Sequence, residues 1–125
     1  MQNRRSFIKG AAALSTIALA PAAFAGGHGR LGTFKGTNNH VTTGTVEVLK
    51  DKVVLLDDFT FDGAPDPKVA FGKDGYDAST LMGPLTSNSG TSTYEIPAGI
   101  NPEDYNEVWI WCERFNVSLG VAKLG

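Results

Sequence analysis

The sequence contains very little cysteine and histidine, and this excludes several classes of redox and metal protein. Cys112 is the only cysteine, and the two histidines are His28 and His40. One cysteine cannot form an intrachain disulfide, and without C-x-x-C there is neither a thioredoxin-type dithiol nor covalently attached haem. Structural zinc sites and iron–sulfur clusters need several cysteines. A blue-copper site is disfavoured because no histidine follows the cysteine and His28 lies in a Gly-rich leader.

Two further motifs are missing. There is no G-x-S-x-G, which disfavours a serine hydrolase of the nucleophile-elbow type. The acidic residues Asp57, Asp58, Asp62 and Asp66 form no D-x-[DN]-x-[DN]-G loop, so a calcium site of that type is not expected. We predict no bound metal from this pattern.

The sequence also lacks an apolar run long enough to span a membrane, which requires about 20 residues. Its apolar run, residues 10–20, follows R-R-S-F-I-K at residues 4–9 and precedes Ala23-Phe24-Ala25. The first pattern is typical of twin-arginine signals, and the second is a cleavage site. An ordinary secretory signal with two chance arginines is the alternative. We therefore predict a signal peptide over residues 1–25 and a mature domain over residues 26–125, periplasmic or secreted, without a stable membrane anchor.

Positive charge is scarce in the mature domain. Removal of Arg4, Arg5 and Lys9 leaves 8 basic residues against 13 acidic ones, a net charge of −5. An acidic domain repels phosphate backbones, so nucleic acid is not expected as a partner.

Helical periodicity is absent from the mature domain, whereas short β-branched runs alternate with Gly, Pro, Asn and Asp. We expect strands near residues 31–34, 41–49, 52–61, 68–72 and 91–97 and over the C-terminal segment. Gly44 is expected at a bulge or a close backbone approach. The continuous apolar run over residues 53–56 predicts that both faces of that strand are buried. Asn101 is expected to cap a helical turn that begins at Pro102. About seven short strands predict an all-β, single-domain β-sandwich or barrel.

Cys112 lies in the apolar segment "EVWIWCERF". In a strand, Val108, Ile110 and Cys112 share one face, and Trp109 and Trp111 share the other. Free cysteine is often a small core residue, so Cys112 is either packing or a working thiol. His40 is either a surface residue or a second ligand. The tryptophans either pack, relay electrons or flank a flat ligand.

At this point the residues resemble a known family, the DM-thirteen domain, a small cysteine-containing domain found beside DOMON domains and alone in bacteria. The resemblance covers residues 31–124, and its most specific part is W-C-x-x-F-x-V. The matching positions are His40, Val41, Gly44, Val46, Asp58, Phe59, Asp62, Gly63, Pro65, Asp66, Val69, Gly72, Tyr94, Ile96, Pro97, Ile110, Trp111, Cys112, Phe115, Val117, Gly120 and Ala122.

The resemblance implies an electron-transfer or thiol-redox module centred on Cys112, acting as a naked thiol or through a non-covalent prosthetic group such as haem. Trp111 and Phe115 would shape the pocket, and His40 would be the candidate second ligand. A redox partner protein is implied but not identified. The alternative is a non-catalytic binding or structural β-domain in which Cys112 is inert core.

Overall fold

The structure is a computed structural model that describes residues 29–125. The predicted signal peptide, residues 1–25, lies outside the described residues. Within these described residues, the secondary structure consists of two 3₁₀ turns and nine strands: β2 (Arg30–Gly36), β3 (Thr42–Thr43), β4 (Thr45–Val48), β5 (Lys52–Leu55), β6 (Thr60–Phe61), β7 (Pro67–Gly72), η2 (Ala78–Thr80), β8 (Ser92–Glu95), η3 (Pro102–Asp104), β9 (Glu107–Cys112) and β10 (Val117–Leu124).

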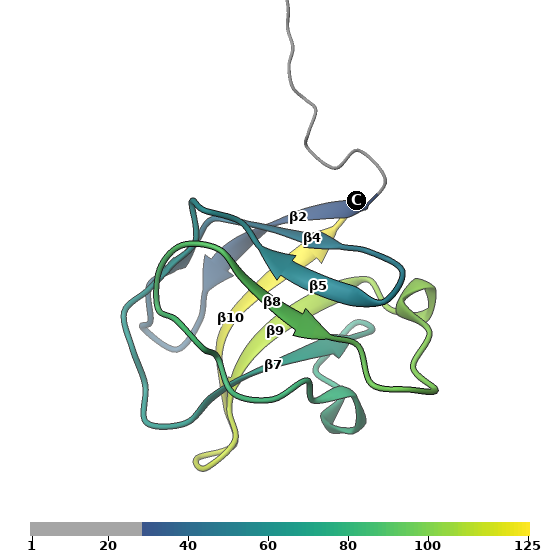
Figure 1. Cartoon of the computed structure of the whole chain (residues 1–125). Helices are drawn as coiled ribbons and strands as arrows, with labels where there is room; N and C mark the ends of the chain where they lie inside the picture. Colours follow the sequence, from purple (N-terminus) through teal and green to yellow (C-terminus); the bar gives the residue numbers. More distant parts are fainter. Residues whose placement is uncertain (1–28) are drawn as a thin grey trace, which may run out of the picture.

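Seven of these strands form one antiparallel sheet in the order β7-β9-β10-β2-β4-β5-β8, and β3 pairs with β6 in a small second sheet. The large sheet curls into a nearly closed barrel (Figure 1). The C-terminus lies beside the start of β2, because Gly125 donates its N–H to the carbonyl of Leu31 at 3.0 Å. The predicted all-β fold of about seven short strands is confirmed, in the barrel-like form.

The core fills the inside of this barrel with side chains from every long strand. Alternation decides which residues enter it: in β5, Val53 and Leu55 are fully buried, whereas Val54 is only half-buried. The prediction of burial on both faces over residues 53–56 was therefore wrong, because one face of β5 points out of the barrel. The buried core cluster comprises Phe34, Val46, Val48, Val53, Leu55, Phe59, Phe61, Val69, Phe71, Tyr94, Val108, Ile110, Cys112, Leu119 and Ala122.

The expected strand over residues 41–49 is split at Gly44 into β3 and β4, which belong to different sheets. Gly44 has a φ of +105°, a conformation that side chains rarely adopt, and a Cβ there would lie 2.5 Å from the Cα of Phe59. This is the close backbone approach that the sequence predicted. Asp58 fixes the corner by accepting hydrogen bonds from the N–H and hydroxyl of Thr45 at 2.8 and 2.7 Å.

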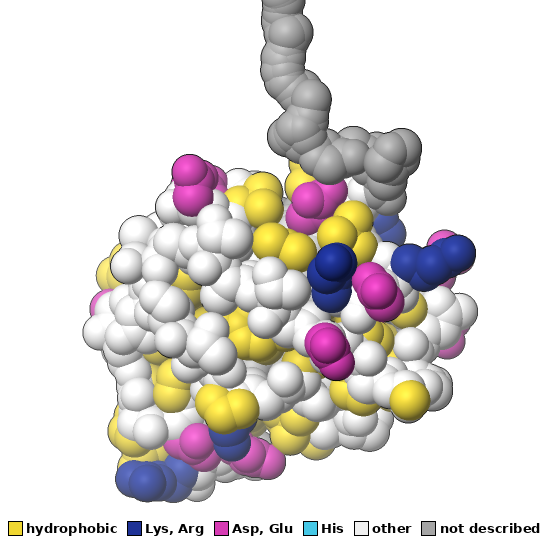
Figure 2. Space-filling view, in the orientation of Figure 1, with side chains coloured by type: hydrophobic (Ala, Val, Ile, Leu, Met, Phe, Trp, Pro, Cys, Tyr) yellow, Lys and Arg dark blue, Asp and Glu magenta, His cyan; other side chains and the backbone are white. Residues whose placement is uncertain are grey.

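Among residues 29–125, no helix has the length and apolarity needed to cross a membrane. On the face shown in Figure 2, lysine and arginine side chains lie among aspartates and glutamates and form no continuous basic patch.

Candidate functional site

Cys112 lies at the end of β9 and points into the barrel. It is 1% exposed and belongs to the same buried face as Val108 and Ile110, as alternation predicted. Its backbone pairs with Pro67 of β7 on one side and with Val117 of β10 on the other. Cys112 is thus held between two neighbouring strands of the sheet.

The Cys112 thiol is free, and within residues 29–125 it has no hydrogen-bond partner. A reactive thiol normally lies in a partly exposed, electropositive environment, whereas Cys112 is surrounded by apolar side chains. The folded barrel therefore leaves this sulfur almost no surface that a reagent in solution could contact.

The outer face of β9 carries an aromatic cluster, defined here as Tyr76, Trp109 and Trp111. The rings of Tyr76 and Trp111 stack with centroids 3.8 Å apart and an interplanar angle of 7°. Trp109 meets Trp111 edge to face at 5.9 Å and 81°. All three side chains are partly exposed. The cluster therefore joins the protein surface to the residue next to Cys112.

A buried carboxylate organises one end of this cluster. Glu107 is 2% exposed, and its Oε1 accepts hydrogen bonds from Trp109 Nε1 at 3.0 Å and from the N–H of Gly75 at 2.8 Å. Its Oε2 lies 3.4 Å from the Lys123 ammonium. These contacts satisfy the charge and fix the loop that carries Tyr76 over the outer face of β9.

The other end of the cluster is set by two weaker contacts. Trp111 Nε1 donates to the side-chain oxygen of Asn116 at 3.3 Å. Asn116 has a φ of +53° in the turn between β9 and β10, which suits asparagine better than most residues. Burial against the ring of Trp111 is the main reason that the pKa of Tyr76 is raised above 10.0, so its phenol stays protonated at neutral pH.

Charged residues border Trp111 on the side of β7. The ammonium of Lys68 lies 3.2 Å from Asp66 and also contacts Glu113. The hydrogen bond to Glu113 is the main reason that the pKa of Lys68 is raised above 10.5. The border of the cluster is therefore a paired group of one positive and two negative charges.

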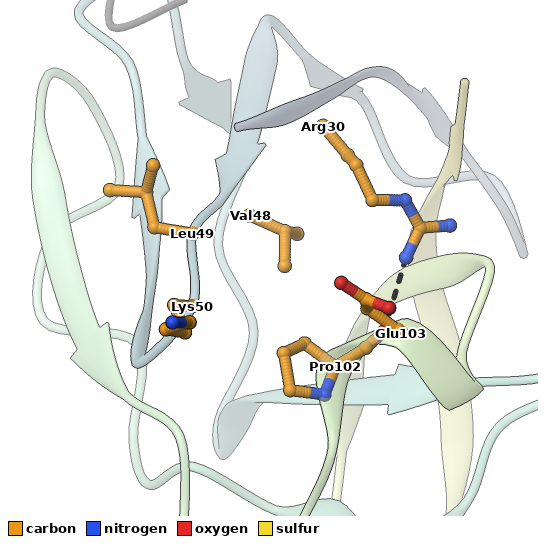
Figure 3. A pocket seen from close by; sticks show the side chains of 6 residues that line it. All are labelled: Arg30, Val48, Leu49, Lys50, Pro102 and Glu103. Carbon is orange, nitrogen blue, oxygen red and sulfur yellow. Dashed lines mark hydrogen bonds between the residues drawn. The ribbon is translucent and has the colours of Figure 1, made fainter. Parts of the chain in front are cut away.

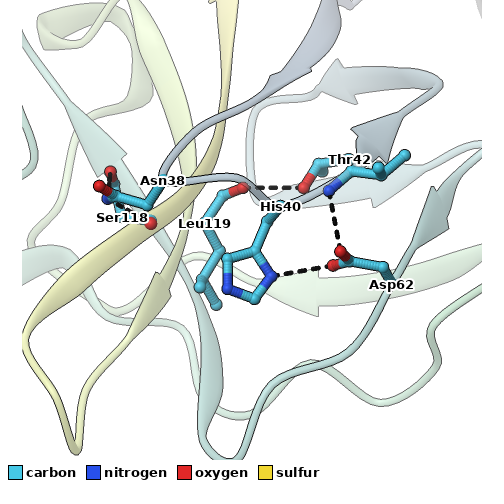
Figure 4. A network of polar contacts seen from close by, with 7 residues as sticks. Asn38, His40, Thr42, Asp62, Ser118 and Leu119 are labelled. Carbon is cyan, nitrogen blue, oxygen red and sulfur yellow. Dashed lines mark hydrogen bonds and ion pairs between the residues drawn. The ribbon is translucent and has the colours of Figure 1, made fainter.

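His40 lies in the connection between β2 and β3, and its ring is occupied by other partners (Figure 4). Its Nδ1 is 2.9 Å from Asp62 Oδ1, and its ring stacks on Phe61 with centroids 5.9 Å apart. Asp62 Oδ2 also accepts the N–H of Val41 at 3.1 Å. No hydrogen bond joins His40 to Cys112 among residues 29–125.

The hydrogen bond from His40 is the main reason that the pKa of Asp62 lies below its ordinary value of 3.8. Asp62 is therefore ionised at neutral pH, and the pair links the start of β3 to the segment after β6. The pair thus has a structural effect of its own, independent of Cys112.

Of the residues expected at one site, the structure brings only Trp111 and Cys112 together, as neighbours whose side chains point to opposite faces of β9. Phe115 is 59% exposed in the turn after β9 and does not belong to the core cluster that contains Cys112. That turn reverses the chain at residues 113–116, so alternation along the strand no longer applies to Phe115.

The described residues do not fit a haem at Cys112. The thiol is enclosed by packed core, and His40 is bound to Asp62. A cavity of about 200 Å³ does open at one end of the barrel, where Arg30 donates to the carbonyl of Pro102 at 3.1 Å (Figure 3), but its lining does not include Cys112. It is also smaller than typical cofactor pockets of about 300–1,000 Å³.

Within residues 29–125, no three His, Cys, Asp or Glu side chains gather as a metal site would require.

Sequence reasoning missed Glu107 and Tyr76. Glu107 could have been found, because it shares the outer face of β9 with both tryptophans at alternate positions. Tyr76 could not, because it stands in a polar loop whose path over β9 depends on the bond from Gly75 to Glu107.

Comparison with known proteins gives one match. A family model described as "Electron transfer DM13" matches residues 33–124, which include every strand from β3 to β10. No curated protein and no solved structure matches the chain.

Proposed function

The chain belongs to the electron transfer DM13 family, and from this premise we propose that it is an exported electron-transfer module. In this proposal the aromatic cluster exchanges single electrons with a partner protein that acts as the oxidant or the reductant. Cys112 on the inner face of β9 is the redox centre: its thiol gives up one electron to the oxidised partner and its proton to solvent, and it regains both on reduction.

The observation that carries the proposal is the continuity of aromatic contact along β9. Tyr76 stacks on Trp111, Trp111 meets Trp109, and Trp111 is covalently joined to Cys112 through the backbone. Such a path connects a partly exposed surface to a sulfur that is 1% exposed. This path runs through packed protein. An electron can move along such a path, whereas a substrate molecule cannot.

Burial of Cys112 suits this role in an exported protein. Export compartments are oxidising, and an exposed thiolate there is converted to disulfides or to higher oxidation states. A sulfur enclosed by core side chains is protected from these reactions. The same enclosure excludes a conventional thiol catalyst, which must touch its substrate.

A second candidate for the oxidised site is Trp109, and its hydrogen bond to Glu107 favours it. When an electron leaves the indole of Trp109 for an oxidised partner, the Nε1 proton can move along the 3.0 Å bond to the carboxylate, and it returns on reduction. Trp111 donates to an amide oxygen of Asn116, which is too weakly basic to take the proton. Trp111 would then pass the electron on, whereas Trp109 could hold the oxidised state.

Protein-film voltammetry on the wild type and on Cys112→Ser separates the two candidates. Loss of the one-electron response in Cys112→Ser supports Cys112 as the centre. A response that survives in Cys112→Ser but disappears in Trp109→Phe places the centre at Trp109 and makes Cys112 core packing. If neither substitution alters the response, the β9 proposal is wrong.

Export is the second part of the proposal, and it rests on Arg4-Arg5 and on the cleavage pattern at residues 23–25. Replacement of both arginines with lysine should block processing and leave the precursor in the cytoplasm. Undiminished processing would show that the twin-arginine route is not used. N-terminal sequencing of the exported wild type should begin at Gly26.

A further inference from the structure

The small cavity at one end of the barrel is separate from β9 and from the aromatic cluster. Its volume is about 200 Å³, and its lining comes from the start of β2, the end of β4 with the turn that follows it, and η3 (Figure 3). An apolar cavity of about 150 Å³ can hold one benzene molecule. The cavity therefore has room for one molecule somewhat larger than benzene.

Three of the residues that line this cavity are apolar. Val48 is 3% exposed and belongs to the core cluster, and Leu49 and Pro102 are half-buried beside the cavity. The methylene groups of Lys50 add to this lining, because a lysine stem can lie along apolar surface while its ammonium stays in water. Apolar surface gains free energy when a hydrocarbon group replaces the water against it. This lining predicts a ligand with a short aliphatic group.

Arg30 and Glu103 bring opposite charges to the same cavity. Figure 3 shows their side chains on one side of it, opposite Leu49 and Lys50. Arg30 Nη1 donates to the carbonyl of Pro102 at 3.1 Å, and Glu103 is the next residue, so this bond holds the two charged groups near each other.

This hydrogen bond uses only one of the several N–H donors of the guanidinium. Within residues 29–125, neither Arg30 nor Glu103 forms an ion pair, with the other or with any further side chain. Both charges are therefore available to a ligand that brings complementary charges.

We propose that this cavity binds a small α-amino acid with an aliphatic side chain. The carboxylate of the ligand accepts hydrogen bonds from Arg30, and its ammonium donates to the carboxylate of Glu103. Its side chain packs against Val48, Leu49 and Pro102. The planar guanidinium fork matches the geometry of a carboxylate.

The position of the two charges is the reason for choosing an amino acid. An α-amino acid carries its ammonium and its carboxylate on one carbon atom, so it needs partners of opposite charge that lie close together. The bond from Arg30 to the residue before Glu103 meets this need. No covalent bond forms or breaks, and the inference is independent of the proposed electron transfer through β9.

The test is a titration of the isotope-labelled, full-length protein with L-leucine, followed through its backbone amide resonances. We expect saturable shifts at residues 48–50 and 102–103, with a dissociation constant of about 1 mM or lower, and no shift at Trp109 or Trp111. No saturable shift at the cavity residues up to about 10 mM leucine would overturn the site.

Three related compounds each lack one part of leucine. Isocaproate lacks the amine, isoamylamine lacks the carboxylate, and glycine lacks the side chain. The two single-charge compounds should bind at least about tenfold more weakly, because each leaves one charged residue without its hydrogen bonds. Glycine should also bind more weakly, because it leaves the apolar lining uncovered. Equal affinity of leucine and isocaproate would show that the ligand is not an amino acid.

Two variants test the charged pair. Glu103→Gln removes the negative charge at nearly the same shape, and Arg30→Lys keeps the positive charge but loses the fork. Each should weaken leucine binding by at least about tenfold. Asp104→Asn is the control, because Asp104 is an exposed carboxylate of η3 outside the cavity lining.

Urea denaturation of the ligand-free proteins checks the fold. Glu103→Gln should match the wild type in this measurement, so that a loss of binding can be assigned to the missing ligand contact. If Glu103→Gln binds leucine as tightly as the wild type, the amino-acid assignment is wrong.

L-Glutamate tests the aliphatic part of the proposal. Lys50 is exposed at the cavity, and a ligand whose side chain ended in a carboxylate would pair with its ammonium as well. We expect leucine to bind more tightly than glutamate. Tighter binding of glutamate, with the preference lost in Lys50→Gln, would overturn the aliphatic assignment.

Discussion

The two faces of β9 have the same backbone and opposite chemistry. On the inner face, Val108, Ile110 and Cys112 are at most 1% exposed and belong to the hydrophobic core cluster. On the outer face, Trp109 and Trp111 are partly exposed and are held by polar atoms of Glu107 and Asn116. The inner face supplies packing that stabilises the barrel, and the outer face carries the aromatic and polar groups.

This difference separates two roles that residues of a cysteine-containing strand can have: stabilising the barrel and exchanging electrons. The sulfur is on the face that stabilises the barrel, whereas the groups that a partner could touch are on the opposite face. A change on the inner face should therefore act mainly on the free energy of unfolding. A change to a partly exposed tryptophan on the outer face should act mainly on electron exchange.

The largest expected effect is that of Ile110→Ala. Ile110 is fully buried at the centre of the inner face, and truncation of such a residue costs about 2–5 kcal/mol of unfolding free energy. Trp111→Leu is the matched change one residue further along, and because Trp111 is partly exposed it should cost clearly less. Urea denaturation of both variants measures the contrast. Equal losses would mean that the two faces do not differ as described.

The next effect is that of Glu107→Gln. The carboxylate accepts two N–H groups, and hydrogen bonds to a charged group contribute about 1.5–3 kcal/mol. Weakening them should lower stability and release the loop that holds Tyr76, which tryptophan fluorescence would detect through the changed stacking. Glu103→Gln, in η3, is the control. A fluorescence spectrum identical to that of the wild type would show that Glu107 does not organise the aromatic cluster.

Cys112→Ser should have a smaller or similar effect on stability, about 1–3 kcal/mol, because it buries a hydroxyl without a partner. Labelling gives a separate readout. In the folded wild type a small thiol reagent should fail to modify Cys112 near neutral pH, and in denaturant the modification should be complete. Rapid labelling of the folded protein would contradict the burial of the sulfur.

The smallest effect concerns Asp62, far from β9 in sequence. Because its pKa is lowered in the folded state, ionised Asp62 contributes stability above pH 3.8, and this contribution is lost as the pH falls through the folded-state pKa. The stability difference between the wild type and Asp62→Asn should therefore be constant at higher pH and shrink below about pH 4. Asp57→Asn, at an exposed carboxyl, is the control. A difference that grows on acidification would mean that the sign is wrong.

Much of the barrel could be predicted because most of its strands have a local sequence pattern of β-branched and alternating apolar residues. Alternation assigned the two faces of β9 correctly, and Asn101 caps η3 as expected by accepting the N–H of Glu103 at 3.1 Å. The sequence predicted a close backbone approach at Gly44, but it did not predict that the strand divides there between two sheets. A glycine indicates a close approach, but the residue that approaches, Phe59, is specified by the tertiary fold.

The candidate site was harder to predict because its parts come from separate segments. Cys112 and Trp111 stand side by side in the sequence, so the strand pattern was enough to relate them. Tyr76 reaches Trp111 because its loop is tied by Gly75 to Glu107 and by Asp74 to Asn106, and no local pattern indicates such ties. Conversely, His40 matched the family pattern, yet its partner is Asp62.

The most direct test of the account is the rate of electron exchange between the folded protein and a soluble one-electron mediator. The comparison uses the wild type, Trp111→Leu and Phe115→Leu. Phe115 is an exposed aromatic residue only four positions away, outside the aromatic cluster, and so it is the matched control. If electrons pass through the outer face of β9, Trp111→Leu should slow exchange at least about tenfold and Phe115→Leu should not. Equal rates in the two variants would contradict the proposed path.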